Sequence, residues 1–253
     1  MIQFGNGRIA LGDCLEVMQS IPAGSVDMIL CDLPYGTTAC SWDSVIPFAP
    51  LWSEYWRIAK PNAAIVLTAA QPFTSALIMS QIDRFRYEWI WDRVNKITDA
   101  LSANNKPMRR HENVCVFYRS KPVYNKQYIM KPRISGGKRG KFGSAYEGDQ
   151  YKRNGEPFQT STVNDHPHNP NSIIAIKGRG GWEGLHPTQK PVALFEYLIR
   201  TYTNEGDTVM DNCLGSGTTA IAAENTGRRW IGIERDRGYF GAACERIARH
   251  VPA

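Results

Sequence analysis

Short apolar runs alternate with longer amphipathic segments along most of this chain. Short apolar runs are typical of buried strands, whereas apolar residues three or four positions apart are typical of helices that cover a sheet. The pattern predicts strands at 26–31, 63–68, 85–92, 113–118, 207–210 and 230–233. It predicts helices at 14–20, 48–60, 72–82, 218–224 and 237–250, and one that begins at Pro191. The alternation indicates an α/β fold, a mostly parallel sheet with helices on both faces.

The pattern breaks down after residue 119, where Gly, Lys, Arg, Asn and Tyr dominate until residue 184. A chain of 253 residues is long enough for one large domain with an insertion of this size. We therefore predict one Rossmann-like domain in two halves, 1–122 and 186–253, separated by an insertion at 123–185.

Positive charge is concentrated in this same region. Residues 119–181 hold twelve Lys or Arg and four acidic residues, an excess of eight, whereas the whole chain carries +6. Such localisation favours a surface that binds a polyanion, although a solvated, partly disordered loop has the same composition. The cations near its centre are Lys131, Arg133, Lys138, Arg139, Lys141, Lys152 and Arg153.

The composition excludes several classes of protein. Hydrophobic residues make up 42% of the chain, but none of the apolar runs approaches the roughly 20 residues that span a bilayer. The first residues lack the layout of a secretory signal. Six scattered cysteines, without Cys-x-x-Cys spacing, favour free thiols over disulfides or zinc. We expect a cytoplasmic, nucleoid-associated protein without a metal site.

A glycine loop lies between the predicted strand 207–210 and the helix at 218. Gly215 and Gly217 let the backbone turn sharply and approach a ligand. Glu234 ends the next strand, 23 residues after Asp211, where a carboxylate suits two ribose hydroxyls. The loop also satisfies the nicotinamide dinucleotide fingerprint, and a tight turn followed by a surface acid would look similar. By itself the loop leaves these alternatives open.

Asp32, Leu33, Pro34 and Tyr35 follow directly after the predicted strand 26–31. Ligands bind at the carboxyl ends of strands in open α/β sheets, so this tetrapeptide is a candidate for the chemistry. The Asp32 carboxylate and the Leu33 carbonyl are two acceptors, which suit the two N–H bonds of an exocyclic amine. Pro34 restricts the residue before it, and Tyr35 offers a face on which a flipped base stacks. A strand end followed by a Pro-Tyr turn is the simpler alternative.

In combination and in this order, the motifs resemble those of the β-class amino-DNA methyltransferases, in which an Asp-Pro-Pro-Tyr motif precedes the S-adenosylmethionine loop. The resemblance covers nearly everything outside the basic segment. Besides the tetrapeptide and the loop it rests on Gly12-Asp13, Ser25-Val26-Asp27-Met28-Ile29, Arg57-Ile58-Ala59-Lys60-Pro61-Asn62, His111-Glu112-Asn113, His186-Pro187-Thr188-Gln189-Lys190-Pro191, and Gly232-Ile233-Glu234 with Tyr239 and Arg246.

The resemblance implies a class I methyltransferase fold in permuted order, S-adenosylmethionine as cofactor and double-stranded DNA as substrate. The amine-binding catalytic residues would be Asp32, Leu33, Pro34 and Tyr35. The cofactor-binding residues would be Asp13 near the adenine, Glu234 at the ribose, Asp211, Gly215 and Gly217 at the methionine part, and Thr188 and Lys190 near its carboxylate. The insertion would recognise the target sequence, with the seven central cations as DNA contacts.

The chain departs from the family pattern at two places. Leu33 stands where the family usually has Pro, but the acting group is a backbone carbonyl. Asn212-Cys213 replaces the usual Pro-Phe, which removes an aromatic wall beside the cofactor.

Several alternatives remain open at this point. The family usually places Ser first for cytosine and Asp or Asn first for adenine, so Asp32 favours adenine N6 over cytosine N4. A nicotinamide-dependent oxidoreductase would leave Asp32–Tyr35 and the charged segment unexplained. A catalytically silent DNA-binding protein is a third hypothesis. A homodimer and a cognate endonuclease are compatible with the sequence, which indicates neither.

Overall fold

The computed structural model describes residues 1–36, 43–129, 168–178 and 189–251. The chain divides into two compact units, Met1–Gln127 with Asn171–Ala253, and Tyr128–Pro170. The first unit contains the helices and strands discussed below. The second falls inside the predicted insertion 123–185, and its two described ends are joined by a bridge between Ile129 and His168.

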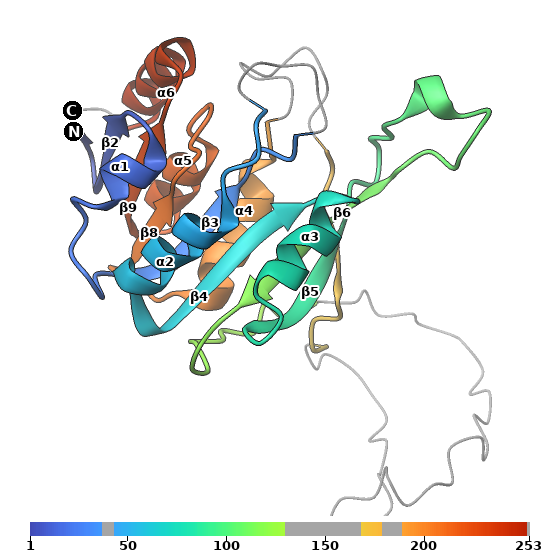
Figure 1. Ribbon diagram of the computed structural model, residues 1–253, viewed down its shortest axis with the longest axis horizontal. Coiled ribbons are helices and arrows are strands. Elements are labelled where there is room, and N and C mark those ends of the chain that lie inside the picture. The colour runs from blue at the N-terminus through green and yellow to red at the C-terminus, as the bar shows by residue number, and fades with distance from the viewer. Residues whose placement is uncertain (37–42, 130–167, 179–188, 252–253) are drawn as a thin grey trace, which may run out of the picture. The chain divides into compact units, whose positions relative to one another are not determined.

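A nine-stranded sheet forms the centre of the first unit (Figure 1). Its order in the described residues is β1 (Ile2–Phe4), β2 (Gly7–Leu11), β9 (Arg229–Glu234), β8 (Thr208–Asp211), β3 (Val26–Asp32), β4 (Ala59–Ala69), β6 (His111–Phe117), β5 (Phe85–Asp92) and β7 (Ile173–Ala175). Only β1 and β6 run opposite to the other strands of this sheet. The mostly parallel α/β fold is therefore confirmed.

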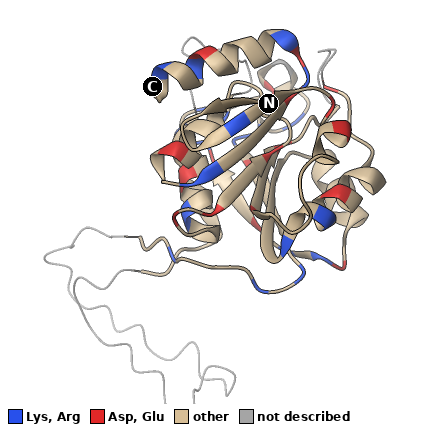
Figure 2. Cartoon of the chain, turned by 90° about the vertical axis from the view of Figure 1, so that its left-hand side faces the viewer, with Lys and Arg blue, Asp and Glu red and all other residues tan. Residues whose placement is uncertain are grey.

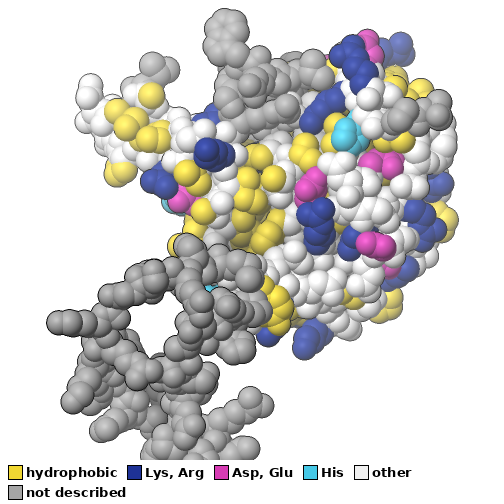
Figure 3. Space-filling model, turned by 180° about the vertical axis from the view of Figure 1, so that it is seen from behind, with side chains coloured by type: hydrophobic (Ala, Val, Ile, Leu, Met, Phe, Trp, Pro, Cys, Tyr) yellow, Lys and Arg dark blue, Asp and Glu magenta, His cyan; other side chains and the backbone are white. Residues whose placement is uncertain are grey.

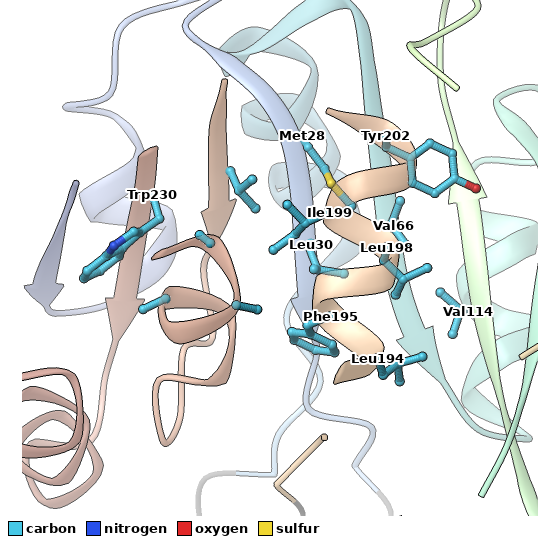
Figure 4. Close-up of a cluster of buried hydrophobic side chains, with 14 of the residues drawn as sticks. Met28, Leu30, Val66, Val114, Leu194, Phe195, Leu198, Ile199, Tyr202 and Trp230 are labelled. Carbon is cyan, nitrogen blue, oxygen red and sulfur yellow. The ribbon is translucent and has the colours of Figure 1, made fainter. Parts of the chain in front are cut away.

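Helices cover both faces of the sheet. Side chains alternate between the faces along each strand, so a strand that is apolar throughout presents apolar side chains on both faces. Ile29 and Cys31 of β3 pack toward α1 (Cys14–Met18), α2 (Phe48–Ile58) and α3 (Phe73–Ser80). Met28 and Leu30 face the opposite core, where α4 (Val192–Tyr202), α5 (Thr218–Asn225) and α6 (Arg237–His250) lie. Figure 4 shows α4 laying a stripe of apolar side chains, from Leu194 to Tyr202, against this face of the sheet.

The structure differs from the predicted elements in two ways. Helix α2 ends at Ile58 and β4 begins at Ala59, whereas a helix to residue 60 and a strand from 63 were predicted. Pro61 disfavours helical backbone at Lys60, and Ala59 pairs with Val26 of β3. The pattern also missed β1, β2 and β7, which are three to five residues long and exist through pairing with neighbouring strands.

Residues 93–110 form an arm that leads away from the sheet between β5 and β6 (Figures 1 and 3). A bridge between Thr98 and Arg109 closes its base, and apolar side chains are exposed along it, among them Ile97 (52%) and Met108 (47%). In the described part of the chain we find no helix with the length and apolar character that crossing a membrane requires.

Candidate active site

Four acidic residues lie at or just beyond the carboxyl ends of neighbouring strands and line one cavity. They are Asp13 after β2, Glu234 in β9, Asp211 in β8 and Asp32 in β3. The cavity has a volume of about 430 Å³, which is in the range of small-molecule sites. The chain leaves β3 for β4 on one side and β8 for β9 on the other. Such a reversal of strand order is where open α/β sheets bind ligands.

Asp32 is the last residue of β3, and three side chains engage its carboxylate. Oδ1 accepts hydrogen bonds from the Thr68 hydroxyl (2.5 Å) and the Tyr35 hydroxyl (2.7 Å). Oδ2 accepts one from Lys190 Nζ at 2.7 Å. Thr68 was not predicted, yet it is a polar residue in an apolar strand and pairs directly with Asp32 in the parallel register. These contacts fix the orientation of the carboxylate at the cavity wall.

The other three residues of the tetrapeptide also line the cavity. The Leu33 side chain is buried in the hydrophobic cluster to which α1, α2 and α3 contribute, so this non-proline residue is accommodated by apolar packing. The Tyr35 ring stacks on Phe73, with centroids 5.2 Å apart and planes 26° apart. Burial and the neighbouring Asp32 carboxylate raise the pKa of Tyr35 well above its ordinary value, so its hydroxyl stays protonated as a donor.

Lys190 lies between two carboxylates in the cavity wall. Its Nζ is 2.7 Å from Asp32 Oδ2 and 3.2 Å from Glu112 Oε2, and its side chain is 6% exposed. Glu112 is also buried and forms an ion pair with Arg93 through Oε1. Lys190 was predicted near the cofactor carboxylate, and the structure pairs it with the Asp32 carboxylate. Neither Glu112 nor Arg93 was predicted as a site residue.

Glu234 is held rigidly by two backbone amides. Its Oε2 accepts from the Gly215 N–H and its Oε1 from the Asp236 N–H, both at 2.7 Å. A carboxylate has about four acceptor positions, so two remain for a ligand. Asp13 lies beside it, since Leu11 pairs with Glu234 and the Gly12 N–H donates to the Glu234 carbonyl. Asp13 also caps α1 through the Leu15 N–H.

Asp211 is buried at the end of β8, with 2% of the residue exposed. Its Oδ1 accepts from the Cys213 N–H at 3.0 Å, and its Oδ2 accepts from the Thr219 hydroxyl. Burial is the main cause that raises the pKa of this carboxyl to about 6, and the nearby Asp32 also raises it. The ionised form of Asp211 therefore costs free energy unless a cation binds next to it.

The two glycines of the loop have different surroundings. Gly215 lines the cavity at φ +55°, and of the described residues a Cβ built on it would meet only the Cys213 carbonyl, at 3.9 Å. Gly217 was predicted to bind the cofactor but is not among the lining residues of the described cavity. It adopts φ +82° before α5, where a Cβ would lie 3.3 Å from Ile247 of α6. Its small size serves the turn and helix packing.

Asn212 and Cys213 stand where an aromatic wall was expected. The Asn212 Oδ1 accepts from the buried Tyr55 hydroxyl at 2.5 Å, so this loop is tied to α2. Cys213 lines the cavity together with Cys14. Burial raises the pKa of Cys31 to about 12, with its Asp211 neighbour contributing. The five described cysteines (14, 31, 115, 213 and 244) are free, as predicted.

Several predicted site residues lie outside the described residues. They are Thr188 and the seven cations Lys131, Arg133, Lys138, Arg139, Lys141, Lys152 and Arg153. Lys and Arg of the described chain are interspersed with Asp and Glu over the sheet and helices (Figure 2). The predicted recognition function of the insertion therefore stays a prediction.

Known proteins resemble this chain along most of its length. The N6/N4 methyltransferase family model described as "DNA methylase" matches residues 26–245. The type II methyltransferase M.HpaI of Haemophilus parainfluenzae is 26% identical over 255 residues, which cover 95% of this chain and 74% of that protein. The type II methyltransferase M2.DpnII of Streptococcus pneumoniae is 47% identical over 66 residues, which cover 26% of this chain and 25% of that protein.

Solved structures match the fold. The crystal structure of an M1.HpyAVI–SAM complex has a TM-score of 0.62 and 23% identity, covering 95% of this chain and 98% of that one. The PvuII DNA methyltransferase, titled cytosine-N4-specific, has a TM-score of 0.70 and 18% identity, covering 98% and 92%. The family match supports a methyltransferase over the nicotinamide-dependent oxidoreductase that the glycine loop had left open.

Proposed function

This chain belongs to the N6/N4 family of amino-DNA methyltransferases, and on that premise we propose that it methylates adenine N6 in double-stranded DNA, with S-adenosylmethionine as methyl donor. One observation carries the proposal. Asp32, the proposed amine-binding group, lines the same cavity as Asp211, Gly215 and Glu234, the proposed cofactor-binding residues.

The cavity fits S-adenosylmethionine in three respects. Glu234 has acceptor positions left for two ribose hydroxyls after binding two amides. Asp211 is a buried carboxylate whose hydrogen-bond partners among the described residues include no cationic side chain, which suits the cofactor's α-ammonium group. The absent side chain of Gly215 leaves open space along the wall. When bound, the cofactor supplies a methyl group on a positively charged sulfur.

The chain's own residues prepare the amine of the base. An exocyclic amine is a poor nucleophile, because its lone pair is delocalised into the ring. The Asp32 carboxylate and the Leu33 carbonyl accept hydrogen bonds from its two N–H groups. This favours tetrahedral geometry at the amine nitrogen and localises its lone pair there. Thr68 and Tyr35 keep the Asp32 carboxylate in place, so its orientation costs little at the moment of reaction. The amine sheds its extra proton readily afterwards, and a tuned general base is not needed.

The preference for adenine rests on Asp32, since an aspartate opens the tetrapeptide where the family's cytosine enzymes usually have Ser. The target base leaves the duplex to reach the cavity, and the insertion 123–185 reads the surrounding sequence. Cytosine N4 is the alternative within the same chemistry.

The test is expression in a methylation-free host, followed by mapping of modified bases in the host DNA. N6-methyladenine within one sequence context is the expected result, and the same host carrying Asp32→Ala is the control. N4-methylcytosine instead would support the cytosine alternative. Unmodified DNA, together with absence of S-adenosylmethionine binding in calorimetry, would indicate a silent DNA-binding protein.

A further inference from the structure

Lys190 lies at the acceptor that the proposed function assigns to the target amine, and near the ring on which the sequence predicts that the base stacks. Its ammonium donates to Asp32 Oδ2 at 2.7 Å, the oxygen left over after Thr68 and Tyr35 have engaged Oδ1. It also lies 5.7 Å from the centroid of the Tyr35 ring. Phe73 stacks on the same ring, with centroids 5.2 Å apart.

A second carboxylate, that of Glu112, lies close to the same ammonium. Glu112 Oε2 is 3.2 Å from Lys190 Nζ and shielded from solvent, but among the described residues it has no hydrogen-bond partner. The other oxygen of Glu112 is engaged by Arg93, which anchors the carboxylate in the cavity wall. A buried acceptor that lacks a hydrogen bond costs free energy, and a small shift of the lysine would satisfy it.

We propose that Lys190 is the resting partner of Asp32, and that it moves to Glu112 when the target amine binds. This inference rests on the proposed function, and both Lys190 and Glu112 are positioning residues in it. In the free protein the lysine neutralises Asp32 and covers Tyr35. A correctly placed amine displaces it and gains the full acceptor strength of an Asp32 carboxylate that is no longer paired. Glu112 keeps the displaced cation inside the wall, where an unpaired charge would be costly.

The exchange would also serve specificity. A base that does not bring an N–H bond to Asp32 cannot replace the hydrogen bond that the lysine loses, so the resting pair persists. The binding free energies of a base that donates to Asp32 and one that does not differ by one charge-assisted hydrogen bond. Such a bond discriminates between the two bases by at least about tenfold.

Glu112→Gln tests the proposal, because the amide keeps an acceptor for Arg93 but no longer attracts the lysine by charge. We expect its kcat for methyl transfer to methylation-free genomic DNA to fall about tenfold or more, with the KM for S-adenosylmethionine within a few-fold. Adding Lys190→Met removes the blocking ammonium, so the double variant should turn over several-fold faster than Glu112→Gln alone. Glu88→Gln, on neighbouring β5 and outside the cavity lining, is the matched control and should leave kcat unchanged.

The outcomes separate positioning from a merely structural role. Unchanged kcat in Glu112→Gln, or a double variant no faster than the single one, would overturn the proposal. If Glu112→Gln unfolds, Glu112→Asp replaces it, since it retains the charge for Arg93 while shortening the reach to Lys190, and the same rescue is expected.

An NMR measurement that does not depend on methyl transfer accompanies the kinetics. With ¹³C-labelled lysine, the Lys190 Cε resonance is identified by its absence from Lys190→Met. It should move when wild-type protein binds the genomic DNA and stay in place in Glu112→Gln; a resonance that does not move in the wild type overturns the exchange. A wild type that binds DNA but transfers no methyl group refutes the proposed function instead, and the resonance still tests the lysine.

Discussion

Asp211→Asn should remove a pH dependence from cofactor binding. The buried Asp211 carboxyl has a pKa raised to about 6, chiefly because burial disfavours its charge. The proposed ligand is the α-ammonium group of S-adenosylmethionine, which stays protonated below its usual pKa of about 7.7. A cation favours the ionised carboxylate, so wild-type affinity should fall as pH falls through 6. Asn has nearly the same shape and keeps an acceptor for the Cys213 N–H.

The size of the effect follows from the fraction of ionised carboxyl. With a pKa near 6, about 9% of Asp211 is charged at pH 5 and about 91% at pH 7. Wild-type affinity should therefore rise about tenfold between these pH values. Asp211→Asn should bind more weakly at pH 7 and show little change with pH.

Protein stability should respond with the opposite sign. The folded-state pKa of Asp211 lies above its ordinary value of 3.8, so the folded protein binds more protons than the unfolded chain between pH 4 and 6. Stability contributed by this group is present at low pH and is lost as pH rises through 6. The unfolding free energy of Asp211→Asn relative to wild type should thus increase by about 2 kcal/mol from pH 4 to pH 7.

Calorimetric titration with S-adenosylmethionine at pH 5, 6 and 7, and urea unfolding at pH 4 and 7, measure the two effects. Asp207→Asn, four residues earlier and outside the cavity lining, is the matched control and should bind like wild type at each pH. Wild-type affinity that is flat across this range, or an equal pH dependence in Asp211→Asn, would refute the reasoning.

Three further predictions concern other parts of the site. Asp32→Ala should lower methyl transfer by about 10²–10³ while cofactor affinity in calorimetry stays within a few-fold, and near-wild-type turnover would remove Asp32 from the mechanism. Glu234→Ala should weaken S-adenosylmethionine binding about tenfold or more; an unchanged dissociation constant would contradict its ribose contact. Neutralising Lys138, Arg139 and Lys141 together should flatten the log–log salt dependence of DNA binding by up to about 3, with cofactor affinity unchanged. An unaltered slope would place recognition elsewhere in the insertion.

Much of the candidate site was predictable because local sequence and sheet geometry suffice for it. Asp32 follows an apolar strand, and Glu234 ends another, so parallel pairing brings both to the same edge. The glycine spacing after Asp211 marks a turn that a ligand approaches, and Gly215 does line the cavity. These features depend on residues close together in the chain, which is why pattern and spacing reveal them.

Other features depend on which strands become neighbours. The short strand β2 is stabilised by pairing with β9, more than 200 residues later, and β6 runs antiparallel between β4 and β5. Thr68 reaches Asp32 only because their two strands pair in that register. Apolar periodicity reports whether a segment is buried, but it carries no information on the partner or the register.

The class of fold, the acidic residues at the strand ends and the loop between β8 and α5 follow from the amino-acid sequence. The pairing of the buried charges follows only from the folded chain. Lys190 meets Asp32 across 158 positions of sequence, and Glu112 joins them from a third segment. A buried charge costs free energy unless an opposite charge lies within a few ångströms. Only the folded chain determines which partners are within that distance.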